Sequence, residues 1–174
     1  MTSIAAASSP EQLDAVRQLM RAFVEWHRDR HGENISLIDR YFDASAFEAE
    51  LAGLPGQYAP PGGRLLLATH LGRPAGCVAL RALSGGACEM KRMFIYPEFH
   101  GRGIGQALAE AVIREATIIG YRVMRLDTSV RQHEAQRLYQ RVGFRVSAPY
   151  YHLPRDLEQW LVFMELELPA TGEL

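Results

Sequence analysis

Apolar residues recur every three or four positions near the start of the chain, which is the spacing of a helix with one buried face. They are Leu13, Val16, Met20, Phe23 and Trp26. The preceding stretch 9–12 supplies a helix start, with a serine as the N-cap, a proline at the first helical position and a glutamine that closes a capping box. A second helix is expected from about Ala44, ending at a loop rich in proline and glycine over 53–63.

The middle of the chain changes to strand-like apolar runs at 64–71, 74–83 and 88–96. Their short connections favour antiparallel hairpins. An amphipathic helix is predicted from Gly105 to Gly120, followed by a strand at 121–128. This strand–helix–strand step implies a parallel strand pairing. A short helix over 133–143 and a last strand over 159–168 complete the expected elements.

These elements predict an α/β chain with a mixed sheet in a single domain covering residues 1–174. The composition, 48% hydrophobic and 22% charged, is ordinary for a globular protein. The net charge of −1 gives no electrostatic reason to expect nucleic acid or an anionic membrane as a partner. The start of the chain lacks the basic region of a signal peptide, and no apolar run approaches the ~20 residues of a membrane span. We therefore expect a cytoplasmic protein, with Cys77 and Cys88 as buried free thiols.

Three glycines at alternate positions, in the stretch GRGIGQ (101–106), open the predicted helix. The stretch fails the G-x-G-x-x-G dinucleotide fingerprint and lacks the Gly-Lys-Ser/Thr that ends a nucleotide P-loop. Two interpretations remain. The glycines form a tight turn only, or they let a pyrophosphate approach the free amides at the start of the helix, where the helix dipole favours negative charge.

The region from Cys88 to Phe144 resembles the GNAT superfamily of acetyl-CoA-dependent N-acyltransferases. The resemblance lies in a strand, then HGRGIG (100–105), a helix, a second strand, and a helix carrying AQRLYQRVGF (135–144). The sequence departs from the family pattern at His100, where the family usually has arginine or glutamine, and at Gln132, where it often has asparagine. The resemblance implies a central mixed sheet flanked by helices, with a coenzyme-binding core at about 87–145.

The resemblance also implies a set of coenzyme contacts. Backbone amides around the glycine turn should hold the pyrophosphate, and a strand segment should hydrogen-bond the pantetheine amides and polarise the thioester. The two central strands should splay apart, with coenzyme A in the gap and Gln132 near the pantetheine arm. The predicted contacts are Gly101, Arg102, Gly103, Ile104, Gly105, Gln106 and Ala107 for the pyrophosphate, and Met93, Phe94 and Ile95 for the pantetheine.

Two residues are candidates for proton transfer. A lysine-like amine is neutral only about once in 2,500 molecules at pH 7, so a base is useful. Glu89 lies eleven residues before His100, the spacing of the base glutamate in the histone-acetylating branch of the family. Alternatively, Glu89 pairs with Lys91, because a strand places both on one face together with Met93. Tyr139 occupies the family's general-acid position, or it packs its ring in the core.

The acceptor is less clearly encoded. The resemblance places its site near 35–42, the loop 53–63 and the segment 147–156. Tyr150 and Tyr151 either form an aromatic wall or face solvent in an ordinary connection, and Arg92 or Arg155 is a candidate to hold a carboxylate. Asp127 and Thr128 end a strand near the expected acyl site. Either residue could support that site indirectly, or the two could simply form the end of the strand.

His27 and His31 are four residues apart on the first helix, and we expect a solvated helix face there and no metal. The function expected overall is transfer of the acetyl group of acetyl-CoA to a primary amine of a small molecule or amino acid by direct attack. The alternative is a non-catalytic acyl-CoA sensor. A homodimer is compatible with either.

Overall fold

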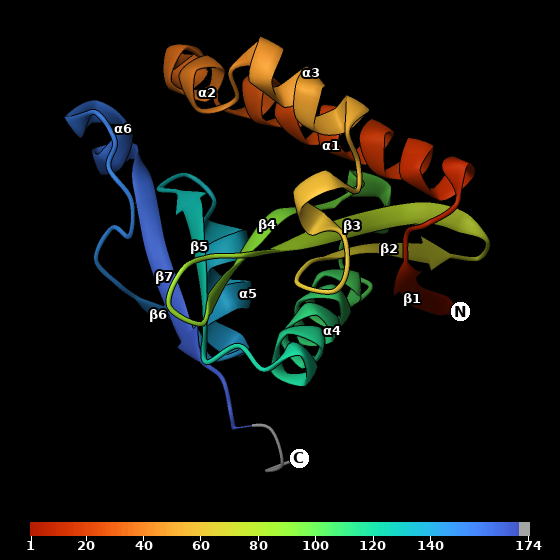
Figure 1. Cartoon of the computed structure of the whole chain (residues 1–174). Coiled ribbons are helices and arrows are strands. Elements are labelled where there is room, and N and C mark those ends of the chain that lie inside the picture. Colours follow the sequence, from red (N-terminus) through yellow and green to blue (C-terminus); the bar gives the residue numbers. More distant parts are fainter. Residues whose placement is uncertain (171–174) are drawn as a thin grey trace.

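The computed structural model describes residues 1–170, which form one seven-stranded mixed sheet with helices on both faces (Figure 1). The order of strands across the sheet is β1-β2-β3-β4-β5-β7-β6. The strands are β1 (Thr2–Ala6), β2 (Arg64–His70), β3 (Arg73–Ala82), β4 (Ala87–Ile95), β5 (Val123–Ser129), β6 (Arg145–Val146) and β7 (Leu161–Glu167). The helices are α1 (Pro10–Arg30), α2 (Ile35–Tyr41), α3 (Ala44–Ala52), α4 (Ile104–Ile119), α5 (His133–Arg141) and α6 (Arg155–Trp160).

The sheet separates two apolar cores, because successive residues of a strand point to opposite faces. On β2, Leu65 and Leu67 pack in the core under α1, α2 and α3, whereas Leu66 and Ala68 pack in the core under α4 and α5. Figure 1 shows these two helical layers on opposite sides of the sheet. Burial of both faces explains why the central strands are continuous apolar runs in the sequence.

Most of the expected elements are confirmed. Ser9 caps α1 in a complete capping box, β2, β3 and β4 pair antiparallel in sequence, and β4 pairs with β5 in parallel. Cys77 and Cys88 are buried free thiols, as predicted.

Four elements were missed. No element was predicted for β1, α2, β6 or most of α6, and the last strand was predicted to begin two residues too early, at 159 instead of Leu161. β1 has a single large apolar side chain, Ile4, and it lies at the edge of the sheet, so it has almost no amphipathic pattern. The helices α2 and α6 have only seven and six residues, and the strand β6 has only two. Elements this short do not give a distinctive periodicity in the sequence.

A β-bulge in β4 changes which side chains face each core. Ala79 pairs with Lys91 and Cys77 pairs with Phe94, so Arg92 and Met93 together oppose one residue of β3, and Arg92 has a φ of 59°. The prediction that Met93 shares a face with Glu89 and Lys91 is therefore wrong. The extra residue inverts the alternation, so Phe94 packs under α1 and Met93 packs on the α4 side.

The parallel strands β4 and β5 diverge after Glu89, before the bulge is reached. Their pairing is confined to Ala87–Glu89 with Val123–Arg125, although both strands continue for several residues. The edges of β4 and β5 that face this gap retain backbone N–H and C=O groups outside the ladder, which a ligand with amide groups can use. The predicted splay of the central strands is thus present.

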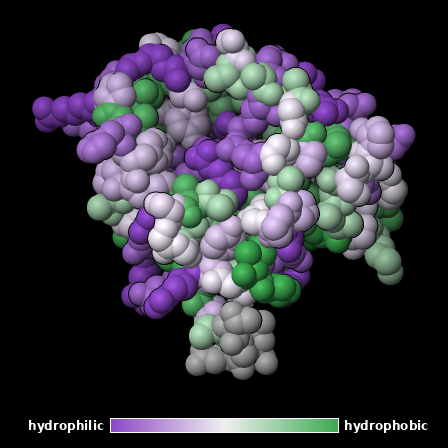
Figure 2. All heavy atoms as spheres, in the orientation of Figure 1, coloured by the Kyte–Doolittle hydropathy of each residue, from purple (hydrophilic) through white to green (hydrophobic). Residues whose placement is uncertain are grey.

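The surface seen in Figure 2 mixes hydrophilic and hydrophobic residues. Large exposed apolar side chains such as Leu71, Ile118 and Val146 belong to different parts of the chain. None of the helices within residues 1–170 is long and apolar enough to cross a membrane.

Candidate functional site

A cavity of about 390 Å³ lies where β4 and β5 separate. One side is formed by the end of β4 and the glycine turn, and the other by α1 and α5. Of the residues predicted to bind coenzyme, those that line it are Met93, Phe94, Ile95, Gly101, Gly103, Ile104, Gly105, Gln106 and Gln132. Arg102 and Ala107 lie outside this lining, although they belong to the same turn and first helical turn. The structure therefore brings the predicted strand segment and glycine turn to one cavity.

The glycine turn presents a helix N-terminus to this cavity. Gly103 is the N-cap of α4 with a φ of 75°, and no side chain among residues 1–170 caps the helix there. The first intrahelical bond runs from the Ala107 amide to the Gly103 carbonyl, so the preceding amides are available as donors. A donor set of this kind fits the pyrophosphate of a coenzyme.

His100, an exposed residue, contacts the backbone at the start of this turn. Its Nε2 lies 2.9 Å from the carbonyl oxygen of Ile95, the last residue of β4. The ring thus ties the glycine turn to the strand on the same side of the cavity. The family usually has arginine or glutamine at this position. Here the histidine contacts the backbone through Nε2 and so helps to hold the loop in place.

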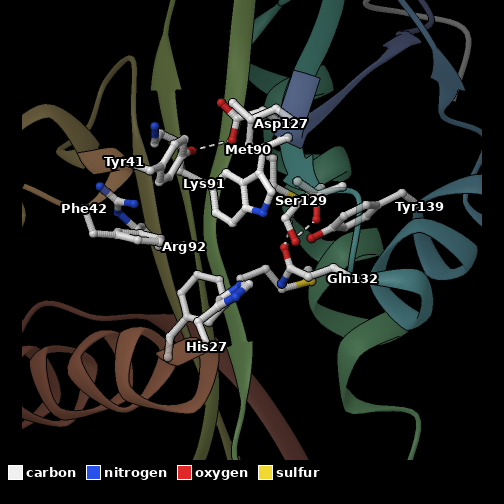
Figure 3. A pocket seen from close by; sticks show the side chains of 15 residues that line it. His27, Tyr41, Phe42, Met90, Lys91, Arg92, Asp127, Ser129, Gln132 and Tyr139 are labelled. Atoms are coloured by element: carbon white, nitrogen blue, oxygen red, sulfur yellow. Dashed lines mark hydrogen bonds between the residues drawn. The ribbon is translucent and has the colours of Figure 1, made fainter. Parts of the chain in front are cut away.

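A second, smaller cavity of about 50 Å³ adjoins the first and is drawn in Figure 3. The two cavities share Phe23, Met93, Gln132 and Tyr139 in their walls. The second cavity is otherwise built mainly from side chains that come from α1, α2, β4, β5, the end of α6 and the start of β7. In Figure 3, the Tyr41 hydroxyl points toward Asp127, and Ser129, Gln132 and Tyr139 lie together on the other side of the cavity.

Asp127 is the acidic residue of this second cavity. Tyr41 donates a hydrogen bond to its Oδ1 and Tyr151 donates to its Oδ2. Burial and the neighbouring Asp127 charge raise the pKa of both tyrosines, so both hydroxyls remain protonated donors at neutral pH. Each carboxylate oxygen keeps further lone pairs for a ligand in the cavity.

Glu89 occupies a different position, behind the wall of the second cavity. Its side chain is 1% exposed, and it lies outside the lining of both cavities. Arg81 Nε donates to its Oε1 at 2.6 Å and the Tyr150 hydroxyl donates to its Oε2 at 2.6 Å. Lys91 Nζ is 3.7 Å from the same Oε1, so the pairing with Lys91 is present but loose.

Tyr139 lies at the junction of the two cavities, on α5. Its ring packs against Phe144 and is almost fully buried, and this burial raises its pKa. The hydroxyl therefore carries its proton throughout the physiological pH range. The ring therefore packs in the core, as one interpretation predicted, and the residue also lines both cavities, while the role of general acid stays a prediction.

His27 and His31 are buried, so the expected solvated helix face is wrong for them. They are 2% and 8% exposed, and their rings pack against Trp26 and Phe23. Burial lowers the pKa of His27 to about 4, which keeps the ring neutral. Within residues 1–170, no cluster of three or more metal-ligating side chains is present.

Several buried polar atoms have no hydrogen-bond partner among residues 1–170. Three of them belong to residues that line the second cavity: His27 Nδ1, Ser129 Oγ and Trp160 Nε1. Unpartnered buried donors and acceptors are rare, because each costs about 1–3 kcal/mol. Their concentration in one cavity favours a polar ligand there.

The late segment 147–156 turns its tyrosines inward, so the interpretation of solvent-facing tyrosines is wrong. The rings of Tyr150 and Tyr151 pack on Phe163, and their hydroxyls reach Glu89 and Asp127. The proline-rich loop 53–63 is outside the lining of the second cavity. Tyr41 falls in the stretch 35–42 predicted to form the acceptor site, and Asp127 and Thr128 were placed near the acyl site. The residues of this cavity that were not predicted as part of it include His27, Lys91, Ser129 and Trp160.

Comparisons with known proteins agree with this geometry. A family model described as an acetyltransferase (GNAT) domain matches residues 61–146. An N-acetyltransferase of Schizosaccharomyces pombe is 34% identical over 169 residues, covering 95% of this chain and 94% of that protein. The N-acetylaspartate synthetase of Homo sapiens is 32% identical over 121 residues, covering 67% of this chain and 40% of that protein.

Solved structures show the same fold. A GNAT family acetyltransferase from Staphylococcus aureus has a TM-score of 0.75 at 19% identity, covering 97% of this chain and all of that one. The PaiA N-acetyltransferase from Thermoplasma acidophilum, in complex with coenzyme A, has a TM-score of 0.71 at 17% identity, covering 96% and 99% of the two chains. Together with the glycine turn and the splayed strands, these matches show that the chain belongs to the GNAT family of acetyl-CoA-dependent N-acetyltransferases.

Proposed function

We propose that this enzyme transfers the acetyl group of acetyl-CoA to a primary amine of a small molecule, amino acids included, bound in the cavity around Asp127. The observation that carries the proposal is the junction of the two cavities at Met93, Gln132 and Tyr139. An acyl group at the inner end of the coenzyme cavity would meet an amine in the second cavity at this junction. The small volume of the second cavity favours a small acceptor over a protein tail.

The names of two relatives support a small acceptor. One is the N-acetylaspartate synthetase already described, and another is an IAA acetyltransferase of Azospirillum brasilense, 37% identical over 111 residues. A non-catalytic sensor is not favoured, because the relatives are named as acetyltransferases and the second cavity carries charged groups that coenzyme binding alone does not need.

In this proposal the coenzyme cavity holds the donor mainly through the backbone. The free amides at the start of α4 bind the pyrophosphate, and the unpaired edge of β4 at Met93–Ile95 binds the pantetheine amides. Bound acetyl-CoA supplies an activated thioester. Gln132 accepts from the Thr128 hydroxyl at 2.6 Å and from the Ser129 amide at 3.2 Å, so it holds the end of β5 beside the junction.

Asp127 is the carboxylate that we assign to the amine. The transfer forms a carbon–nitrogen bond, breaks the carbon–sulfur bond and releases one proton for each ammonium that is acetylated. A carboxylate in contact with the amine can orient it and receive that proton. Asp127 lines the cavity, whereas Glu89 lies behind Lys91 with both oxygens engaged. Catalysis by Glu89 stays a prediction, and the geometry favours an indirect role in fixing Arg81 and Lys91.

Tyr139 is the group that we assign to the leaving sulfur. Its raised pKa makes it a persistent hydrogen-bond donor, which stabilises negative charge as the thiolate departs. Because the ring is packed in the core, the hydroxyl is held in place at the junction.

The proposal is tested by measuring free thiol released from acetyl-CoA over a panel of small amines and amino acids, with the N-acetylated product identified by mass spectrometry. We expect amine-dependent release with at least one small acceptor. Binding of acetyl-CoA without release on any acceptor would contradict the proposal and support the sensor. A lysine-rich peptide that outperforms every small amine would contradict the small-acceptor assignment.

A further inference from the structure

We infer that the acceptor is a zwitterionic amino acid whose ammonium binds Asp127 and whose carboxylate binds Lys91. This inference rests on the proposed function, since it names the chemical class that the second cavity selects. It is carried by the arrangement of charges around the cavity and by the unpartnered polar atoms in its wall.

The charged side chains near the cavity include two tight ion pairs, and outside these pairs stand one anion, Asp127, and one cation, Lys91, which is only loosely paired with Glu89. Arg92 makes a two-pronged contact with Glu50, at 2.8 and 3.2 Å. Arg81 contacts Glu89 at 2.6 Å, and the second oxygen of Glu89 is taken by Tyr150. Asp127 and Lys91 remain, and both line the cavity.

Among residues 1–170, neither of these two groups is hydrogen-bonded to an opposite charge. Asp127 is satisfied by the neutral hydroxyls of Tyr41 and Tyr151. Lys91 Nζ is 3.7 Å from Glu89, beyond hydrogen-bonding distance, although its side chain is only 15% exposed. An ammonium with three donors is seldom buried this far without acceptors. The cavity thus offers a carboxylate for a cation and an ammonium for an anion.

A simple amine would leave this arrangement incomplete. Its ammonium would complement Asp127, but it would add a positive charge beside Lys91 and raise the net charge of the site. Burying an uncompensated charge is costly, whereas a zwitterion brings a counter-charge for each group and leaves the net charge unchanged. The site is therefore complementary to an amino acid rather than to an amine alone.

The unpartnered polar atoms point to the same ligand. Trp160 Nε1 is a donor only, and the Ser129 hydroxyl can donate, so both can serve an acceptor-rich group. A carboxylate has two oxygens with about four lone-pair sites, enough for Lys91 and a second donor together. An alkyl amine offers no acceptor to these atoms while it is charged.

The test compares each amino acid with its own amide, for example glycine with glycinamide and alanine with alaninamide. The amide keeps the amine and the side chain and removes only the negative charge. The amine of an amino acid amide is also the less basic of the two, so a preference for the acid runs against intrinsic reactivity. We expect kcat/KM for the acid to exceed that for the amide by about tenfold to a hundredfold, the scale of one charge-assisted hydrogen bond.

Two variants assign the preference to Lys91. In Lys91→Met, which keeps an unbranched apolar stem and removes the ammonium, the acid-to-amide ratio should fall to within about twofold of unity, and in Lys91→Arg it should persist. Circular dichroism and acetyl-CoA affinity verify that each variant is folded. The comparison on the unaltered enzyme decides the matter even where Lys91→Met does not fold.

The outcomes separate this inference from the function on which it rests. Acids and amides acetylated equally well by the unaltered enzyme would overturn the inference and leave the transferase proposal intact. A preference for acids that survives in folded Lys91→Met would overturn the assignment to Lys91. No thiol release with any acceptor would mean that the proposed function itself has failed.

Discussion

The two cavities of this enzyme meet at Tyr139 but are built in different ways. The coenzyme cavity takes much of its wall from one stretch of chain, Met93–Gln106, and offers backbone amides at a helix start and along a strand edge. The second cavity, where we place the acceptor, is lined by side chains from α1, α2, β4, β5, α6 and β7, and its lining includes Asp127 and Lys91. The difference indicates a donor site that tolerates changes of side chain and an acceptor site that depends on individual side chains.

The largest effect is expected at Asp127. Asp127→Asn keeps the shape and most of the hydrogen bonding, but it removes the negative charge that faces the amine. We expect kcat/KM for the acceptor to fall by about 10²-fold or more, while acetyl-CoA affinity stays unchanged. Steady-state kinetics and calorimetric titration measure the two quantities.

Asp156→Asn is the matched control for this substitution, because Asp156 forms an exposed ion pair with Arg40 away from both cavities. It should leave both quantities unchanged. If folded Asp127→Asn kept its activity, the acceptor would not be bound where we place it.

A substitution in the glycine turn should affect only the donor side. In Gly103→Val a side chain would enter the coenzyme cavity at a φ of 75°, so acetyl-CoA affinity should fall by more than about tenfold. Gly85→Val is the control, because Gly85 has a φ of 68°, equally open space around it, and a place in the β3–β4 turn away from the cavity. Both variants lose stability through the same backbone strain. If the two variants bound acetyl-CoA with equal affinity, the glycine turn would not be the pyrophosphate site.

Tyr139 belongs to both cavities, so its hydroxyl should affect the reaction more than binding to either one. Tyr139→Phe keeps the packed ring and removes the donor. We expect kcat to fall by about tenfold, with acetyl-CoA affinity changed less than about twofold. Unchanged kcat would leave Tyr139 as part of the wall and would mean that water protonates the sulfur.

Two roles of Glu89 can be told apart by substitution. Its spacing from His100 predicts a catalytic base, whereas its buried position favours a structural partner of Arg81 and Lys91. If it only fixes Arg81 and Lys91, Glu89→Gln should lower the rate by a few-fold, equally at every pH, and destabilise the fold by about 1–3 kcal/mol. The first is measured as a pH–rate profile and the second by urea unfolding. A deficit of about 10²-fold near neutral pH that shrinks as pH rises would show Glu89 to be the base, as its spacing from His100 predicts.

The last prediction concerns stability and not the rate: it is a pH dependence of the free energy of unfolding caused by His27, at the wall of the second cavity. The pKa of His27 is lowered to about 4 in the folded state, so below its ordinary value of about 6.5 the unfolded chain binds this proton more readily. Stability should therefore fall between pH 6.5 and 4, by up to about 2 kcal/mol at pH 5. His27→Phe, which fits among Phe23 and Phe42, should flatten this part of the urea-unfolding profile. An unchanged profile would show that His27 is not buried neutral.

The same contrast explains what could be predicted from sequence. The capping box, the hairpins and the glycine turn are local patterns, so the fold and most of the coenzyme cavity followed from spacing and from the family resemblance. The acceptor cavity required Tyr41, Asp127 and Trp160 to be brought together from distant parts of the chain. The bulge at Arg92 also reversed the alternation of β4 and moved Met93 away from Glu89, and no turn residue marks it in the sequence.

The central claim is that the two cavities form one continuous site, and a single ligand can test it. Coenzyme A linked through its sulfur and an acetyl group to the nitrogen of glycine would span both cavities, whereas S-ethyl coenzyme A would fill only the first. The account predicts that calorimetric titration finds the glycine conjugate bound at least about tenfold more tightly. Equal affinity of the two ligands would contradict it, because the acceptor part would then gain nothing from the cavity around Asp127.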